Sequence, residues 1–179
     1  LGSRSPRTLQ AKYWLAYALH EQGKGAEALQ LLRTLLATAE SQPSTQVDER
    51  VLQVIVPRIM QLISRLLVLS GNTRDALSMA DTALERMTKL LPPGHPEILD
   101  ANQERASKLA FSNQLPSAMK LARETLESCK RYLGTEHEIS CMAAHTYAHF
   151  CLSSQNPAEG DEELVWAIPA MQRIVGSEH

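Results

Sequence analysis

The chain has 179 residues, 18 of them basic and 20 acidic, and carries a formal net charge of −2. That balance lacks the basic surface by which proteins bind nucleic acid, so we expect no nucleic-acid partner. The most apolar stretch, VLQVIVPRIMQLISRLLVLS, is interrupted by Arg58, Arg65 and Pro57, which argues against a membrane span or a membrane partner. The three cysteines follow no zinc or disulfide spacing, so we expect reduced thiols in a cytoplasmic protein. Because the first residue is not Met, we expect a fragment of a longer protein.

Eight helices are predicted, in pairs joined by short turns. From the N-terminus, KYWLAYALHEQ and AEALQLLRTLLATAE flank Gly23, and IMQLISRLLVLS and RDALSMADTALERMTKLL flank Gly71. Next, PEILDANQERASKLAFS and PSAMKLARETLESCKRYL flank Asn113, and EISCMAAHTYAHFCLS and EELVWAIPAMQRIV flank Gln155. Apolar residues recur at intervals of three and four within these segments, which is the helical period.

A spacing of 42 residues relates the pairs to one another. It separates three histidines in the short phrases between pairs, His95, His137 and His179. The same spacing relates small residues on both sides of each turn, where two helices can cross closely: Ser64, Ala106 and Ala148, then Ala76, Ala118 and Gly160. The first pair fits, with Ala16 and Ala28, if its unit is six residues longer. We therefore predict one array of about four antiparallel helical hairpins over residues 1–179. Its repeats cover about 5–43, about 44–92 with the enlarged connection, about 95–134 and about 137–176.

The phrases between pairs are interpreted as helix stop and start signals. Gly134 is expected to end a helix in the left-handed conformation. Thr135 is expected to cap the next helix, with Glu138 completing a capping box. Pro96 suits a first helical turn, because its missing N–H is not needed there. The six extra residues precede Pro57, and we favour a long helix from about Thr45 that kinks at Pro57 over a short separate segment.

Hairpins with small residues at these places resemble tetratricopeptide repeats. The 42-residue period with its Gly-His phrase resembles the kinesin light chain variety, which also occurs in signalling ATPases. The region from LRTLLATAESQP through PPGHPEIL to LGTEH also resembles the helical C-terminal domain of SET-and-MYND lysine methyltransferases. No SET motif or MYND zinc cluster accompanies it. The resemblance implies an all-α superhelix that binds partners along a concave groove lined by the first helix of each hairpin.

Candidate groove residues follow from that resemblance. They are aromatic, amide, arginine, hydroxyl and histidine side chains on the first helix of each hairpin: Tyr13, Trp14, Tyr17, Arg58, Gln61, Arg65, Gln103, Ser107, His145 and His149. Light-chain members carry an Asn pair in successive repeats, and this chain does not. The mixture suits a protein or peptide ligand with apolar and acidic residues.

A metal site is the alternative for the last hairpin, because His137, Cys141, His145 and His149 are spaced four apart. We favour groove or packing roles, because successive steps of four drift around a helix instead of converging on one ion. No catalytic arrangement stands out, so we expect neither an enzyme nor a cofactor.

The sequence thus predicts an intracellular protein–protein interaction scaffold. The alternative is a regulatory or self-association segment that contacts another domain of the same protein, in a signalling-ATPase or SET-type methyltransferase context. Joint exposure of several apolar residues over 45–70 would favour the alternative; they are Val51, Val54, Leu62, Leu66 and Leu69. The repeat pattern continues through IVGSEH, so we also expect an uncapped C-terminal hairpin and association at high concentration.

Overall fold

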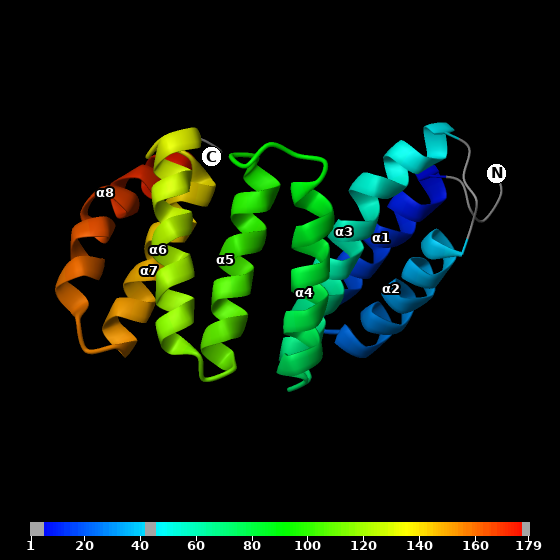
Figure 1. Cartoon of the computed structure of the whole chain (residues 1–179), viewed down its shortest axis with the longest axis horizontal. Helices are drawn as coiled ribbons and strands as arrows, with labels where there is room; N and C mark the ends of the chain where they lie inside the picture. Colours follow the sequence, from blue (N-terminus) through cyan, green and yellow to red (C-terminus); the bar gives the residue numbers. More distant parts are fainter. Residues whose placement is uncertain (1–5, 42–45, 177–179) are drawn as a thin grey trace. The chain divides into compact units, whose positions relative to one another are not determined.

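The computed structural model describes residues 6–41 and 46–176, and these residues form eight α-helices and no strand (Figure 1). The all-α fold is therefore confirmed. The helices are α1 (Pro6–Glu21), α2 (Gly25–Glu40), α3 (Gln46–Leu69), α4 (Thr73–Thr88), α5 (Pro96–Phe111), α6 (Leu115–Tyr132), α7 (Glu138–Ser153) and α8 (Pro157–Gly176). The chain divides into two compact units, Leu1–Leu90 with α1 to α4 and Leu91–His179 with α5 to α8. A single array over residues 1–179 stays a prediction.

The turn inside each hairpin lies where the sequence places it. Gly23 and Gly71 adopt φ of +76° and +80°. Asn113 and Gln155 take the same left-handed conformation with φ of 60° and 62°, although they have a Cβ. Asn tolerates this region, whereas a long side chain such as Gln rarely does. The four predicted turns are confirmed.

Small residues let the two helices of each hairpin cross closely. Ala16 and Ala28 are fully buried, as are Ala106 and Ala118. A Cβ added to Gly160 would lie only 2.8 Å from the Cα of Ala148, so that crossing admits no side chain. The 42-residue register of small residues therefore reflects backbone contact between paired helices.

Histidine caps the first helix of each hairpin in the second unit. The Nδ1 of His137 accepts a hydrogen bond from the backbone N–H of Ile139 at 3.1 Å, and α7 begins at Glu138. The Nδ1 of His95 accepts from the N–H of Glu97 at 3.2 Å, and α5 begins at Pro96, as predicted. The predicted capping box of Thr135 is wrong, because the acceptor lies two residues further along. Gly134 ends the preceding helix with φ of +82°, as expected.

Helix α3 is the central helix of the first unit. It is continuous through Pro57, which confirms the long helix; its expected start at Thr45 lies outside the described residues. Because α1, α2 and α4 all pack against it, α3 has buried apolar side chains on several of its sides. Examples are Ile59, Ile63 and Leu66. The Leu52–Leu69 window has a mean hydropathy of 1.6, so by length and composition it passes as a membrane span, contrary to the sequence argument. However, 56% of the window is buried, as in the core helix of a soluble protein.

Among the described residues, the second unit has more buried polar or charged residues than the first, and it also has a polar network near its surface. The Lys108 ammonium, nearly inaccessible to solvent, donates to Glu104 at 2.8 Å. The Tyr147 hydroxyl of α7 donates to Glu159 of α8 at 2.6 Å, and the guanidinium of Arg123 of α6 donates to both groups. Burial, followed by the hydrogen bond to Glu159, raises the pKa of Tyr147. This network ties three consecutive helices together.

Candidate functional site

Six of the ten predicted groove residues lie in the first unit, where α1 packs beside α3. Tyr13 and Tyr17 are half-buried and pack against the hydrophobic core, whereas Trp14 is 55% exposed. The Trp14 ring meets those of Tyr13 and Tyr17 edge to face, with centroids 5.3 and 6.0 Å apart. The structure thus brings these three side chains together as one aromatic cluster.

The remaining three of these six residues lie on α3. Arg58, Gln61 and Arg65 are all half-buried. The Gln61 amide donates to the Met87 sulfur at 3.8 Å, and both arginines already interact with other groups of the chain. A ligand at this surface would therefore meet arginines that are partly held in place.

The other four predicted residues lie on α5 and α7 of the second unit. Gln103 is buried, and its amide donates to the backbone carbonyl of Ile139 at 3.1 Å, which holds α7 beside α5. Ser107 donates to the Gln103 carbonyl, whereas His145 and His149 are exposed. Gln103 thus has a structural contact that the sequence pattern did not indicate. Ligand contacts by any of the ten residues stay a prediction.

The residues of the alternative metal site do not converge. His137 is engaged as a helix cap, and Cys141 is buried, with burial raising its thiol pKa. Among the described residues, no group of three His, Cys, Asp or Glu side chains is arranged to hold a metal ion.

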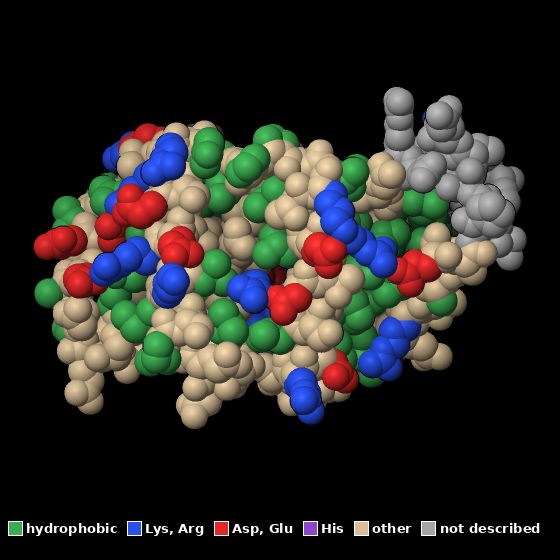
Figure 2. All heavy atoms as spheres, in the orientation of Figure 1, with side chains coloured by type: hydrophobic (Ala, Val, Ile, Leu, Met, Phe, Trp, Pro, Cys, Tyr) green, Lys and Arg blue, Asp and Glu red, His purple; other side chains and the backbone are tan. Residues whose placement is uncertain are grey.

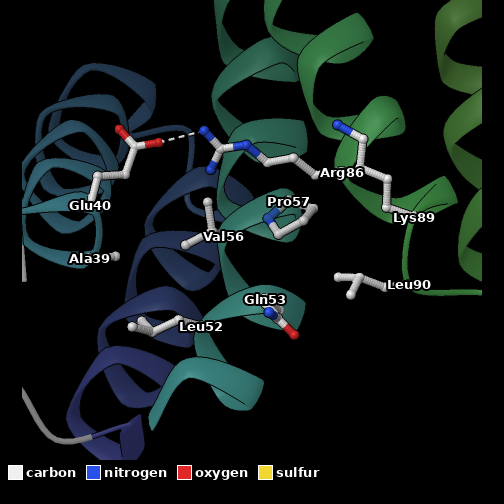
Figure 3. Close-up of a pocket in the computed structure, with 9 residues that line it drawn as sticks. All are labelled: Ala39, Glu40, Leu52, Gln53, Val56, Pro57, Arg86, Lys89 and Leu90. Atoms are coloured by element: carbon white, nitrogen blue, oxygen red, sulfur yellow. Dashed lines mark hydrogen bonds and ion pairs between the residues drawn. The ribbon is translucent and has the colours of Figure 1, made fainter. Parts of the chain in front are cut away.

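A hollow in the first unit was missed by sequence reasoning (Figure 3). It has a volume of about 560 Å³ and lies among the end of α2, the first half of α3 and the end of α4. Figure 3 shows Arg86 of α4 reaching Glu40 of α2 across it, and this ion pair measures 2.8 Å. The lining residues are Ala39, Glu40, Leu52, Gln53, Val56, Pro57, Arg86, Lys89 and Leu90.

The repeat register contained a signal for this hollow. Leu52 and Leu90 stand 42 residues before Gly94 and Tyr132. In the second unit the Tyr132 ring lies against Gly94 so closely that an added Cβ would come within 2.3 Å of it. In the first unit the equivalent pair is two leucines, and both line the hollow.

A smaller hollow of about 250 Å³ lies between α7 and α8. Its walls are mostly apolar and also contain a histidine: Cys141, Met142, His145, Thr146, Leu164, Ala167, Ile168 and Met171. Figure 2 shows hydrophobic atoms at the surface, among charged ones, over the end where Figure 1 places α8.

Known proteins share this architecture. The tetratricopeptide repeat family model matches residues 109–138, from the end of α5 to the start of α7. Kinesin light chain-like TPR repeats from Podosopora anserina share 20% identity with a TM-score of 0.71, covering 97% of this chain and 80% of theirs. BtubC (BKLC) from P. vanneervenii shares 15% identity with a TM-score of 0.76, covering 94% of this chain and 64% of its own. No curated protein sequence matches the chain.

A third similar structure is Bacillus thuringiensis PlcR in complex with the peptide PapR7 and DNA. It shares 11% identity with a TM-score of 0.76, covering 95% of this chain and 58% of its own. At these identities the likeness to all three structures concerns the fold. Hairpins, crossings and turns define a helical-repeat protein. Residues 109–138 thus match a tetratricopeptide repeat, and the fold is similar to that of kinesin light chain-like TPR repeats.

Proposed function

We propose that the protein is a non-catalytic cytoplasmic scaffold that binds a peptide or partner helix along the first helices of its hairpins. The observation that carries this proposal is the aromatic cluster of Tyr13, Trp14 and Tyr17 on α1, a helix that packs against α3. Large aromatic rings with few rotatable bonds dominate binding hot spots. PlcR, a structure of similar fold, was solved with a peptide, which supports this class of ligand.

The arginines of α3, the helix that packs against α1, suggest the chemistry of the ligand. Arg58 and Arg65 lie seven residues apart, and therefore share a face of α3. Guanidinium groups favour carboxylates, so a ligand with one apolar and one acidic anchor fits this surface. Peptide affinities in the micromolar range, about −8 kcal/mol, would let these few anchors dominate binding.

The test is a titration of the chain with a library of short peptides that combine aromatic and acidic residues. A Trp166→Phe background leaves Trp14 as the one tryptophan and hence a fluorescent reporter at the proposed site. Trp14→Ala, followed by fluorescence anisotropy of labelled peptide, should weaken binding about tenfold or more, because it removes an aromatic anchor.

Arginine variants test the acidic half of the ligand. Arg58→Ala with Arg65→Ala should weaken binding of the same peptide, and more so at low salt, where exposed charges are least screened. Arg33→Ala with Arg74→Ala is the matched control, because both arginines are exposed on second helices of hairpins. Equal losses in the two double variants would contradict a role for the α3 face.

A further inference from the structure

The long first half of α3 forms one wall of the larger hollow, which the proposed peptide surface does not use. Helix α3 begins at Gln46, whereas α5 begins at Pro96, which aligns with Val54 in the 42-residue register. The first unit therefore has about two extra turns at the start of α3. Leu52 lies in these turns and Val56 follows them, and both line the hollow between the ends of α2 and α4 (Figure 3).

Most of the wall is apolar. Its apolar members are Ala39 of α2, Leu52, Val56 and Pro57 of α3, and Leu90, which follows α4. The volume of about 560 Å³ lies within the range of about 300–1,000 Å³ that is typical of sites for small molecules. Such sites are mostly apolar and contain a few polar groups that fix the orientation of the ligand. The hollow therefore suits a small molecule with an apolar body.

An aromatic ring occupies the aligned positions of the second unit. There the Tyr132 ring lies against Gly94, within 2.3 Å of where a Cβ would stand. Tyr132 aligns with Leu90, and Gly94 aligns with Leu52. The first unit thus lacks a ring of its own at this point in the repeat, and a flat ring from a ligand would supply it.

Pro57 leaves a backbone acceptor on the same side of α3. Because proline has no N–H, the helical hydrogen bond from residue 57 to the Gln53 carbonyl is missing. Gln53 and Pro57 both line the hollow, so the carbonyl that points from one toward the other lies at its wall. An acceptor beside apolar groups favours a donor. A ligand ring that carries an N–H or O–H therefore fits better than a plain hydrocarbon.

Cations outnumber anions among the residues that line the hollow. Arg86 and Lys89 are the cations, and Glu40 is the anion. Glu40 contacts Nη2 of Arg86 at 2.8 Å, and a guanidinium has further N–H donors for a second carboxylate. Lys89 pairs with Glu85, but both side chains are more than two-thirds exposed, so this pair is weak and exchanges readily for a ligand. A carboxylate on the ligand complements these charges.

We propose that the larger hollow binds a small aromatic carboxylate whose ring carries an N–H or O–H donor, as in an indole or phenol acid. The ring packs against the apolar wall, its donor bonds to the Gln53 carbonyl, and its carboxylate binds Lys89 and Arg86. None of the lining residues is among the candidate groove residues, so the proposal does not rest on the peptide surface.

The experiment titrates indole-3-acetate into the whole 19.8 kDa chain and follows the backbone amides by NMR. The amides that shift should be those around the hollow. Naphthalene-1-acetate lacks the N–H and should bind about threefold weaker or more, because the carbonyl then loses a donor. Tryptamine replaces the carboxylate by a cation and should bind about tenfold weaker or more. Equal affinities for the three probes, or shifts confined to other helices, would overturn the proposal.

Two variants test the wall and the charge. Leu90→Tyr places a ring where the second unit has one, so it should block the hollow and weaken indole-3-acetate binding about tenfold or more. Lys89→Gln should weaken indole-3-acetate but leave the neutral indole-3-acetamide unchanged. Lys120→Gln is the matched control, because Lys120 is exposed on α6 of the second unit. Undiminished binding in Leu90→Tyr, or equal losses in the two lysine variants, would contradict the site.

Two more variants separate the polar contacts. Glu40→Gln removes the one anion of the lining and should strengthen binding of indole-3-acetate. Pro57→Ala restores an N–H to the helix, so indole-3-acetate should lose its advantage over naphthalene-1-acetate. Circular dichroism checks that each variant is folded. Weaker binding in a folded Glu40→Gln variant would overturn the carboxylate contact, and a retained advantage in Pro57→Ala would overturn the hydrogen bond to the carbonyl.

Discussion

Helices α3 and α5 are each the first helix of consecutive hairpins, but their side chains at equivalent positions differ in polarity. Aligned on Ser64 and Ala106, three buried apolar residues of α3, Met60, Ile63 and Leu66, correspond to Asn102, Arg105 and Lys108 of α5. Helix α3 packs against α1, α2 and α4, so much of its circumference needs apolar side chains. Helix α5 packs against α6 and α7 and accommodates an almost inaccessible Lys108 by pairing it with Glu104.

The 42-residue repeat thus preserves small residues at the helix crossings, but it does not preserve the polarity of side chains at other equivalent positions. Ser64 and Ala106 both lie at helix crossings and are fully buried. Other aligned positions differ in polarity. Within its unit, α3 is stabilised mainly by apolar burial, whereas α5 retains charged side chains that pair with each other.

The largest expected effect comes from a truncation in α3. Ile63→Ala should lower the free energy of unfolding by about 2–5 kcal/mol, because Ile63 is 1% exposed and its loss leaves a cavity. Urea unfolding followed by circular dichroism measures the change. Val54→Ala in the same helix is the control, since Val54 is 44% exposed and should change stability by about 0.5 kcal/mol or less. Equal losses at the two sites would show that α3 is not a core helix.

A smaller effect is expected where the two helices of one hairpin cross. The Ser64 hydroxyl donates to the Ala76 carbonyl at 2.5 Å, so Ser64→Ala should cost about 0.5–1.5 kcal/mol. The reciprocal Ala106→Ser should also destabilise, by about 1 kcal/mol, because the α5 crossing has closed around a methyl group. Thermal unfolding of the two variants and the wild type measures both changes in stability. A gain in stability from Ala106→Ser would mean that the two crossings are interchangeable.

The smallest effect concerns a thiol beside α5. Burial, and then the Asp100 carboxylate, raise the pKa of Cys129 to about 11. The folded state therefore binds this proton more tightly than the unfolded state, and the corresponding stability is present below the ordinary thiol pKa and lost as pH rises toward 11. As pH rises from 8 to 9.5, the free energy of unfolding should fall further in the wild type than in Cys129→Ala, by an extra amount of up to about 1 kcal/mol. Urea unfolding at each pH measures this difference. An equal pH dependence would contradict the burial of this thiol.

Helix positions were predictable because they depend on local signals. The turns at Gly23 and Gly71 follow from glycine's tolerance of positive φ, and the recurring small residues follow from close crossings. The sequence favours Thr135 as the cap of α7, because Ser, Thr, Asp and Asn are the usual capping residues. A histidine Nδ1 makes the same contact two residues later, and residue preference alone does not indicate it.

The surfaces were less predictable because they depend on neighbouring helices. Gln103 has the polarity of a groove residue, but its amide binds a carbonyl of the next hairpin. Of the apolar residues singled out on α3, Leu62 and Leu66 are buried, Val54 and Leu69 are exposed, and Val51 lies outside the residues whose side chains are described. Val54 and Leu69 stand about 22 Å apart along the helix, so they do not form one patch.

The histidine caps let α5 and α7 begin through contacts within their own boundary phrases. His95 and His137 each satisfy an N–H only two residues away, and Gly134 ends its helix through its own backbone conformation. A hairpin with its boundary phrase is therefore a portable module of 42 residues. Duplicating or deleting one such module would leave the remaining histidine cap with its own N–H partner, so the number of hairpins could change in one genetic step without loss of that helix start.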